Sequence, residues 1–363
     1  MSGQISTLIT VVLALLVSAG CNAATPVSPA NTPPTPANEV IFYNWEGDVP
    51  QPVLAAFTRE YGVNVTYVIY ESQEEAIENM RAGQTYDLVI MESRFVPLLI
   101  QEGLLARINR RNIPNFKNIS ANFRDLSYDP GNQYSVPYSW GTTGLVVRSD
   151  LAAQPVTSWA DLWDPRYAGK VGLWRGQPRE TIALTLKSLG YSANSETPAE
   201  LETALQRLIQ LKPNLIFLEE FDLETSAGVM LSGQAVISMG YANDVLQGRA
   251  ENPAITYVLP AEGALVWGDN FVIPANRPHP DTAELFLNFL LRPEISAQIV
   301  NQTHYASANQ AAQQFVETEI QVDPVIFPPD RDLKNAEIIL PLSAEGQELY
   351  NNIWARFLAA PSP

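Results

Sequence analysis

The 363-residue sequence has little of what a disulfide framework, a metal site or a nucleophilic active site requires. It contains one cysteine and two histidines, so no structural disulfide can form within the chain. His279 lies between prolines in a polar turn, and His304 has no histidine or cysteine near it in the sequence. Both are expected to be surface or local structural residues rather than ligands. We therefore expect no metal site and no cofactor.

The common catalytic motifs are also missing. The sequence has no glycine-rich phosphate-binding loop, no Gly-x-Ser-x-Gly elbow and no His-Glu-x-x-His motif, which removes the most frequent kinase and hydrolase templates. A pair of carboxylates of the glycosidase type leaves no signature in a single sequence, so a glycosidase-like enzyme stays open as an alternative. We identify no catalytic residue and predict that the protein is not an enzyme.

Positive charge is scarce. The chain has 22 Lys and Arg residues against 39 Asp and Glu residues, a formal net charge of −17. Such a chain repels phosphate backbones and anionic headgroups, so nucleic acid is not expected as a partner. An acidic chain attracts cationic ligands, but acidic surfaces also serve solubility alone. The charge therefore permits a cationic ligand without requiring one.

The N-terminus carries an apolar run from Leu8 to Val17, which is too short to span a bilayer and has the length of a signal-peptide core. The following Ser18-Ala19-Gly20-Cys21 resembles the lipobox of bacterial lipoproteins, in which the cysteine is acylated and anchors the protein. No Lys or Arg precedes the run, and Ser18 stands where an aliphatic residue is more common. Cleavage nearby, giving a soluble exported protein, is therefore the alternative. We predict a signal peptide over residues 1–20 and lipidation of Cys21.

Residues 21–38 are predicted to be the lipidated cysteine and a tether. The segment 23–38 is rich in proline and has no aromatic and no charged residue, which is typical of an extended linker. At roughly 3.1 Å per residue in polyproline geometry, it would hold a folded domain away from the membrane. The expected location is the periplasm, with the lipid as the only membrane contact.

From Glu39 onward, short apolar runs alternate with amphipathic stretches. This pattern predicts a β-α-β-α-β unit, in which apolar strands with helical crossovers form a parallel sheet and ligands bind beyond the strand carboxyl ends. Its predicted strands are 40–45, 63–70 and 86–91, and its predicted helices are 50–61, 74–81 and 97–102.

A second unit of the same kind follows from about Gly144. Thr197, Pro198 and Glu200 predict an N-cap, a first-turn proline and a capping-box acid for the helix that follows. The length of the chain suits two lobes with a cleft between them. The other predicted elements are strands at 214–218, 234–239 and 255–259, and a helix at 283–291.

Several aromatic residues stand beside acids near predicted strand ends. Aromatic faces attract ammonium groups and cover methylene chains, while carboxylates neutralise the amines. Trp45 and Trp267 each follow a predicted strand, whereas Trp159, Trp163 and Trp354 lie in apolar helical patterns and are predicted to be core residues. The aromatic and acidic runs are Trp45-Glu46-Gly47-Asp48, Met91-Glu92-Ser93, Arg179-Glu180, Trp267-Gly268-Asp269 and His304-Tyr305.

Six segments together carry a family resemblance. They are Phe42-Tyr43-Asn44-Trp45, Tyr70-Glu71-Ser72, Tyr86-Asp87-Leu88-Val89, the run from Tyr134 to Gly141, the run from Thr157 to Trp163, and Asn288-Phe289-Leu290-Leu291-Arg292-Pro293. In this order, over nearly all of residues 39–315, they resemble the bacterial periplasmic spermidine/putrescine-binding protein family. The resemblance implies the α/β type II periplasmic-binding-protein fold, with two lobes of mainly parallel sheet flanked by helices and a ligand cleft between them. Lobe 1 would comprise residues 39–142 and 267–322, and lobe 2 residues 143–266 and 323–363.

The resemblance also implies a function. Such proteins are substrate-binding components of ATP-binding-cassette (ABC) importers, which close on a polyamine and deliver it to a permease in the inner membrane. Aromatic residues line the alkyl chain and acids hold the amines. Carried over by position, Asp269 would pair with one amine, Glu180 with another, and Trp267 would pack along the methylenes. The five positions that match the family site are Trp45, Glu180, Trp267, Asp269 and Tyr305.

The departures from the family pattern predict a remodelled pocket. An additional arginine opposes a polyamine unless an acid neutralises it, because a buried unpaired charge costs several kcal/mol. Two alternatives therefore stay open: an amino acid or other amine whose carboxylate Arg94 grips, and a ligand sensor on the same fold. In either case we expect a monomer. At the departing positions, Asp48 stands where the family has a tyrosine, Gln177 where it has an aspartate, and Met239, near Tyr241, where it has a tryptophan. Glu92 and Arg94, on either side of Ser93, stand where the family has a serine and an aromatic residue. Glu46, Asp48 and Glu92 are additional candidate carboxylates for the ligand.

Overall fold

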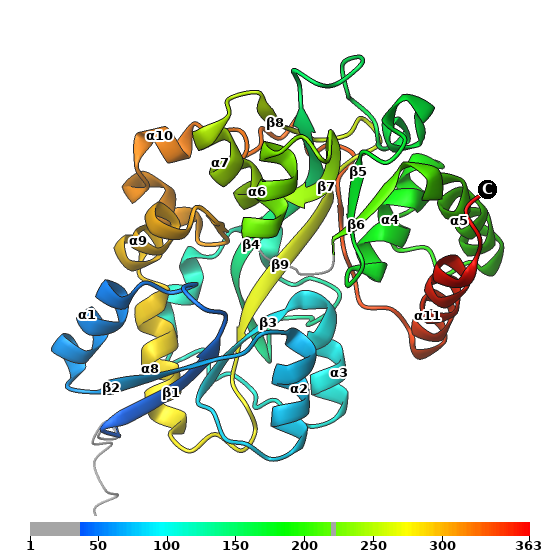
Figure 1. The fold of residues 1–363 in the computed structure, drawn as a ribbon. Coiled ribbons are helices and arrows are strands. Elements are labelled where there is room, and N and C mark those ends of the chain that lie inside the picture. Colours follow the sequence, from blue (N-terminus) through cyan, green and yellow to red (C-terminus); the bar gives the residue numbers. More distant parts are fainter. Residues whose placement is uncertain (1–36, 219–222) are drawn as a thin grey trace, which may run out of the picture. The chain divides into compact units, whose positions relative to one another are not determined.

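A mixed sheet runs through residues 37–218 and 223–363, the part of the protein that the computed structural model describes (Figure 1). Within these ranges the sheet has eleven strands, and its main path is β2-β1-β3-β9-β4-β7-β5-β6. None of the helices within the same ranges is both long and apolar enough to cross a bilayer. The predicted signal peptide, Cys21 and nearly all of the predicted tether lie outside the described residues.

Lobe 1 contains the predicted β-α-β-α-β unit, with boundaries shifted by one or two residues. Strand β1 pairs in parallel with β2 on one side and β3 on the other. Helix α1 ends where Gly62 adopts a positive φ of 69°, a conformation that glycine adopts without steric cost. The elements are β1 (Glu39–Asn44), α1 (Gln51–Tyr61), β2 (Asn64–Ile69), α2 (Gln73–Arg81), β3 (Leu88–Glu92) and α3 (Val96–Gln101).

Lobe 2 repeats the arrangement around a second parallel group, in which β5 lies between β6 and β7. The predicted capping box of α5 is wrong: the side chain of Thr197 makes no cap hydrogen bond, and the Glu200 carboxylate accepts a hydrogen bond from Ser195 instead. The elements are β5 (Val171–Trp174), α4 (Pro178–Ser188), α5 (Pro198–Leu211), β6 (Leu215–Leu218), α6 (Leu223–Leu231), β7 (Ile237–Tyr241), α7 (Ala242–Glu251) and β8 (Ile255–Val258).

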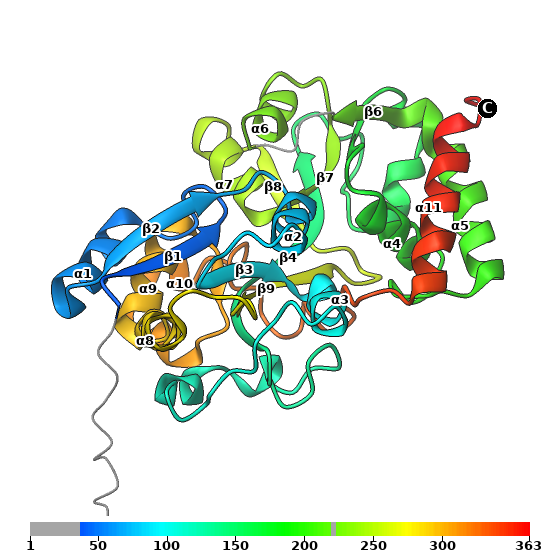
Figure 2. The ribbon, with the colours of Figure 1, turned by 90° about the horizontal axis from the view of Figure 1, so that it is seen from below.

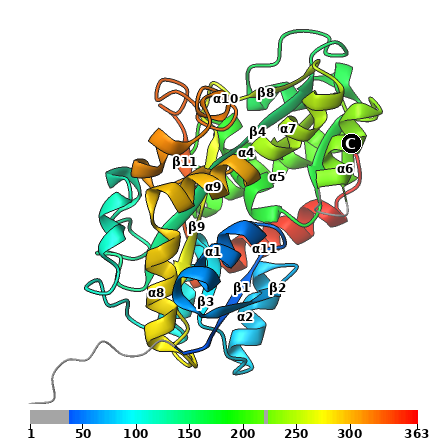
Figure 3. The same cartoon turned by 90° about the vertical axis from the view of Figure 1, so that its left-hand side faces the viewer.

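Two long strands join the lobes. Strand β4 (Ser135–Arg148) pairs antiparallel with β9 (Leu265–Val272), and the register shifts between Pro137 and Trp140. Beyond this pair, β9 continues to β3 of lobe 1 and β4 continues to β7 of lobe 2. In Figure 3, α1, α2 and α8 lie in the lower half of the view, and α6, α7 and β8 lie in the upper half. The sheet is therefore mixed at its centre rather than parallel throughout.

The C-terminal part of the chain contributes elements to both lobes. Helix α8 packs against β1 of lobe 1, whereas α11 packs beside α4 and α5 of lobe 2 (Figure 2). Between them, the short strand β11 pairs in parallel with β9 at Leu265 and Val266. The elements are α8 (Pro280–Leu290), α9 (Pro293–Thr303), β10 (Ala306–Ser307), α10 (Thr318–Gln321), β11 (Glu337–Ile338) and α11 (Ala344–Ala359).

The lobes have separate hydrophobic cores. One is built around Phe42, Phe57 and Phe286, and another around Trp159 and Trp174. Trp159 is fully buried, and its indole N–H donates to the carbonyl of Gly263 over 2.9 Å, which confirms its predicted place in the core. Trp163 and Trp354 are partly buried and pack against the lobe 2 clusters.

Both histidines have local structural positions, as predicted. The backbone N–H of His279 donates to Asp87 over 2.7 Å, and its Nδ1 atom lies 2.9 Å from the same carboxylate. His304 ends α9 with a left-handed φ of 59°.

Candidate ligand-binding site

Four carboxylates from both lobes converge where β3, β9 and α4 meet. Glu92 ends β3 and lies directly opposite Asp269 of β9 in the sheet register. Asp48 follows β1, and Glu180 stands in the first turn of α4. Asp269 interacts electrostatically with Glu92 and Asp48, and Glu180 interacts with Glu92. We call Asp48, Glu92, Glu180 and Asp269 the acidic cluster.

Glu180 is the carboxylate that lobe 2 contributes to this cluster. Its side chain is 7% exposed and accepts hydrogen bonds from the Thr143 hydroxyl over 3.1 Å and the Tyr241 hydroxyl over 3.0 Å. Burial raises its pKa to about 7, with repulsion from Glu92 acting in the same direction, while Arg94 and the two hydroxyls act against the rise. A carboxyl group with this pKa is partly protonated at neutral pH unless a cation is brought to it.

The carboxyl groups of the two aspartates, like that of Glu180, have raised pKa values. Burial raises the pKa of Asp48 to about 6, although hydrogen bonds to Asn44 and Tyr138 oppose the rise. Burial also holds the pKa of Asp269 well above its usual range, and the charges of Glu92 and Asp48 add to the effect. Within residues 37–218 and 223–363, neither aspartate nor Glu180 forms an ion pair. Among the described residues, the site therefore holds one buried carboxyl group, that of Glu180, and two partly buried ones, those of Asp48 and Asp269, without a direct counter-ion.

Arg94 has an acidic partner within the site. Its Nε atom donates to Glu92 over 2.8 Å, and the side chains of Arg94 and Glu92 are only 22% and 16% exposed. Its guanidinium carbon lies 4.7 Å from the centre of the Phe95 ring. Burial opposes the charged form of Arg94, but Glu92, Glu180 and Glu74 outweigh it, and the pKa of Arg94 is raised. The sequence left open whether an acid pairs with Arg94, and the structure shows that Glu92 does.

Aromatic rings form a wall beside the acids. Trp267 packs edge-to-face on Tyr305, with ring centres 5.6 Å apart, and on Tyr241 at 6.1 Å. Its ring covers Gly141 so closely that a Cβ atom there would lie 2.3 Å from the indole. Across the site, Trp45 packs on Tyr70 with ring centres 4.6 Å apart. The expectation that Trp267 follows a strand is wrong, because Trp267 lies inside β9. Asp269 lies two residues further along the same strand and therefore on the same face of the sheet.

The other predicted positions have more varied surroundings. Glu46 is exposed at the turn after β1. The Ser93 hydroxyl is buried and donates to the carbonyl of Gly268 over 2.8 Å. Gln177 precedes α4 and makes no side-chain cap bond. Met239 is fully buried in the lobe 2 core, opposite Leu145 of β4.

Several partners of the acids were not identified from the sequence. Thr143 and Ser139 of β4 hydrogen-bond to Glu180 and Asp269, the latter over 3.4 Å. Tyr138, whose hydroxyl donates to the Asp48 backbone over 3.0 Å, belongs to the same strand. Ile338 of β11 lines a small cavity together with Trp267, Asp269 and other residues. The run from Tyr134 to Gly141 was the one signal for this strand, but the sequence did not connect it with the carboxylates.

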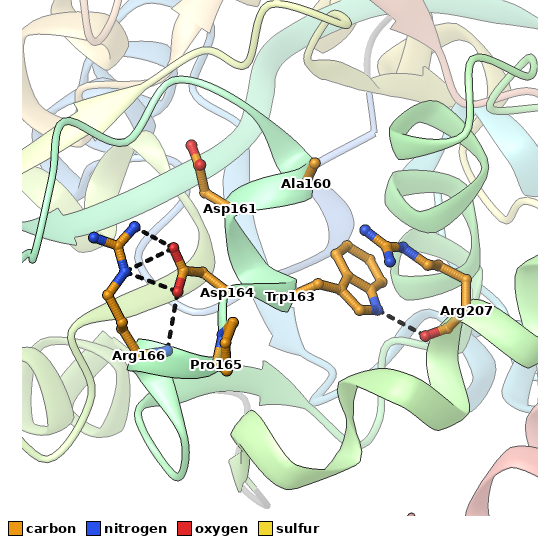
Figure 4. A pocket seen from close by; sticks show the side chains of 7 residues that line it. All are labelled: Ala160, Asp161, Trp163, Asp164, Pro165, Arg166 and Arg207. Atoms are coloured by element: carbon orange, nitrogen blue, oxygen red, sulfur yellow. Dashed lines mark hydrogen bonds and ion pairs between the residues drawn. The ribbon is translucent and has the colours of Figure 1, made fainter.

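A second depression, on the surface of lobe 2, is a weaker candidate. It has a volume of about 600 Å³ and is lined by residues such as Trp163, Asp164, Arg166 and Arg207 (Figure 4). Several of its polar groups pair with one another: Arg166 donates to Asp164 over 2.9 Å, and the indole of Trp163 donates to the carbonyl of Arg207 over 2.7 Å. It shares no residue with the acidic cluster. Among the described residues, no group of three or more His, Cys, Asp or Glu is arranged to hold a metal ion.

Comparison with known proteins identifies the family. The model of the bacterial extracellular solute-binding protein family matches residues 53–328. The spermidine/putrescine-binding periplasmic protein of Escherichia coli (strain K12) is 34% identical over 303 residues, which cover 83% of this chain and 86% of the relative. The chain therefore belongs to the bacterial extracellular solute-binding protein family.

Solved structures agree with this assignment. The spermidine/putrescine ABC transporter substrate-binding protein PotD of Streptococcus pneumoniae superimposes with a TM-score of 0.80 at 30% identity, covering 89% of this chain and 99% of that chain. The TpPotD lipoprotein of Treponema pallidum superimposes with a TM-score of 0.78 at 27% identity, covering 88% and 99%. The predicted two-lobed type II fold is confirmed.

Proposed function

We propose that this protein is the extracytoplasmic substrate-binding component of an ABC importer and that its ligand is a polyamine of the putrescine and spermidine class. The observation that carries the proposal is a trio of buried or partly buried carboxyl groups, Asp48, Glu180 and Asp269, which lack a direct counter-ion among the described residues. Folding leaves these groups with raised pKa values because burial penalises their charge. A ligand with several ammonium groups removes that penalty at each end.

The aromatic wall fits the rest of such a ligand. Trp267 lies two residues before Asp269 in β9, and Tyr241 both donates to Glu180 and packs near Trp267. Ring faces cover methylene groups and attract nearby ammonium groups. The relatives named above for binding spermidine and putrescine support the same ligand class.

The alternative of an amino-acid ligand depends on Arg94 being available to a carboxylate. Arg94 instead donates to Glu92 over 2.8 Å, and a ligand carboxylate would have to compete with that contact among four acids. A sensor that uses the same pocket would bind the same ligand and would differ only in its partner. Because the family consists of solute-binding transport proteins, delivery to a permease is the role that we propose.

Calorimetric titration of the purified protein tests the ligand assignment. The protein is first unfolded and refolded to remove carried-over ligand, and it is then titrated with putrescine, spermidine and glutamate. We expect micromolar or tighter binding of a polyamine, equivalent to about −8 kcal/mol or better, and no heat from glutamate. Binding of glutamate without binding of either amine would refute the proposal.

The anchoring of the protein is part of the same proposal. We propose that the signal peptide ends at Gly20, that acylated Cys21 holds a monomer at the membrane, and that the tether lets it reach the permease in the periplasm. The lobe boundaries at 142/143 and 266/267, with residues 323–363 returning to lobe 2, belong to this proposal. The relative from Treponema pallidum is described as a lipoprotein, which supports the anchor. Mass spectrometry of the membrane-extracted protein and of a Cys21→Ser variant tests it: lipid mass on the parent protein and none on the variant is expected.

A further inference from the structure

Arg94 is the one cation in direct contact with the acidic cluster among the described residues. It is the middle residue of the 3-10 turn η1 (Ser93–Phe95), which follows β3, and its guanidinium is held by Glu92 over 2.8 Å and by the face of Phe95. Both members of the ion pair are largely buried. The charge of Arg94 is therefore a fixed part of the site rather than a mobile surface group.

The carboxyl groups that remain fall into two groups, which serve as the two ends of the site. Asp48 and Asp269 interact with each other, and the charges of both raise the pKa of Tyr70 and of Tyr138. Glu180 is held by Thr143 and Tyr241 and interacts with Glu92 and Arg94. Since Glu92 is already paired, one end offers the two aspartates and the other offers Glu180. Two anionic ends match a ligand with two ammonium groups.

Arg94 lies within electrostatic reach of both ends. It acts on the carboxyl groups of Glu180 and Asp269 alike, and it repels the buried guanidinium of Arg179. A ligand that joins the two ends therefore passes close to a fixed positive charge. A diamine places only methylene groups between its ends, whereas a triamine carries a third positive charge along its chain, and like charges in a buried site repel each other strongly.

We propose that Arg94 is a resident cation that takes the place of one ligand ammonium group, so that the site selects a short diamine over a longer triamine. This inference rests on the proposed polyamine-binding function and adds a specificity-determining residue to it. Arg94 acts by its charge, so an uncharged residue of similar shape at this position should remove the preference for a diamine over a triamine.

Titrations of putrescine and spermidine against the full-length parent protein and an Arg94→Gln variant test the inference. The parent protein is expected to bind putrescine more tightly. In the variant, the ratio of the spermidine to the putrescine dissociation constant is expected to fall at least tenfold. Arg94→Lys, which keeps the charge, is expected to retain the parent preference, and Arg166→Gln, at a surface pair in lobe 2, serves as the matched control.

The outcomes separate this inference from the proposed function. If both amines bind and their ratio stays within twofold in Arg94→Gln, the resident-cation role is refuted while polyamine binding stands. If neither amine binds the parent protein, both are refuted. Should Arg94→Gln fail to fold because Glu92 is left unpaired, the double variant Glu92→Gln, Arg94→Gln removes the pair together and must show the same shift towards spermidine.

Discussion

Replacing Glu180 with glutamine should weaken ligand binding and at the same time stabilise the empty protein. The side chain is 7% exposed, forms no ion pair among the described residues, and accepts hydrogen bonds from Thr143 and Tyr241. The amide oxygen of glutamine can accept the same two hydrogen bonds. The substitution therefore removes the buried charge and preserves most of the surrounding contacts.

The magnitude follows from the pKa of Glu180, which burial raises from an ordinary value of 4.5 to about 7. A shift of this size means that the ionised carboxyl group destabilises the folded state by about 3 kcal/mol, at 1.36 kcal/mol per pKa unit. Because the folded-state value is the higher one, the contribution of the carboxyl group to stability is full below pH 4.5 and is lost as the pH rises through 7. Glutamine cannot ionise, so Glu180→Gln should be more stable than the parent protein by up to about 3 kcal/mol at pH 8 and nearly equal to it at pH 4.5.

Urea unfolding of the ligand-free proteins at pH 8 and at pH 4.5 measures this difference. Glu202→Gln is the matched control, because Glu202 is an exposed glutamate paired with Arg356 over 2.8 Å, and its replacement should change stability by less than about 1 kcal/mol. Calorimetry should show polyamine affinity at least tenfold lower in Glu180→Gln. No gain in stability at pH 8, or an equal gain at both pH values, would refute the view that Glu180 is an uncompensated charge.

Three further predictions concern the same site and its support. Asp269→Asn should lower polyamine affinity at least tenfold by calorimetry, because it removes a desolvated charge partner of the ligand; unchanged affinity would show that Asp269 does not hold an amine. Trp159→Ala should cost about 3–5 kcal/mol in urea unfolding through loss of core packing, with affinity per folded molecule unchanged, and a selective loss of affinity would contradict its core role. Polyamine affinity should fall as the pH drops below 7, because Glu180 with a pKa of about 7 and Asp48 with a pKa of about 6 take up protons. Titrations in buffers of different ionisation enthalpy should show proton release on binding at pH 7, and no release would contradict the raised pKa values.

The β-α-β-α-β unit of lobe 1 was predictable because its signals are local. Apolar runs of strand length are separated there by helices whose ends carry their own markers, such as Gly62 after α1 and Ser72 before α2, whose hydroxyl accepts from the Glu75 backbone over 3.1 Å. The packing partner of each element is its neighbour in the sequence. Such elements can be located to within a few residues without knowledge of the rest of the chain.

The crossing strands β4 and β9 were not predicted, and their sequences explain why. Strand β4 contains Pro137, Gly141 and Gly144, and β9 contains Gly268, all of which argue against a strand when read locally. Each has a tertiary reason: the register shift begins at Pro137, and Gly141 makes room for the indole of Trp267. The signals for these strands lie in a partner more than a hundred residues away.

The same limit applied to the site. The acids and aromatic residues were visible in the sequence, but the hydrogen-bond donors that hold them, Thr143 and Ser139, come from β4 and were missed. The role of Arg94 was left open because its effect depends on which acid it contacts. Only the folded chain reveals that Glu92, two residues earlier, turns its carboxylate to Arg94 while lying opposite Asp269.

The placement of the acids on both lobes also gives a physical reason to expect the lobes to close when a ligand is bound and to stay apart when the cleft is empty. Glu92 belongs to lobe 1 and Glu180 to lobe 2, and repulsion between them contributes to the raised pKa of Glu180. Without ligand, bringing the lobes together either buries these like charges or forces Glu180 to take up a proton, and both outcomes oppose closure at neutral pH. An ammonium group placed at Glu180 converts the repulsion into attraction, and a second one at Asp48 and Asp269 does the same on the lobe 1 side. We expect this electrostatic penalty to couple ligand binding to closure, so closure of the Glu180→Gln variant should depend less on ligand, as small-angle scattering with and without a polyamine would measure.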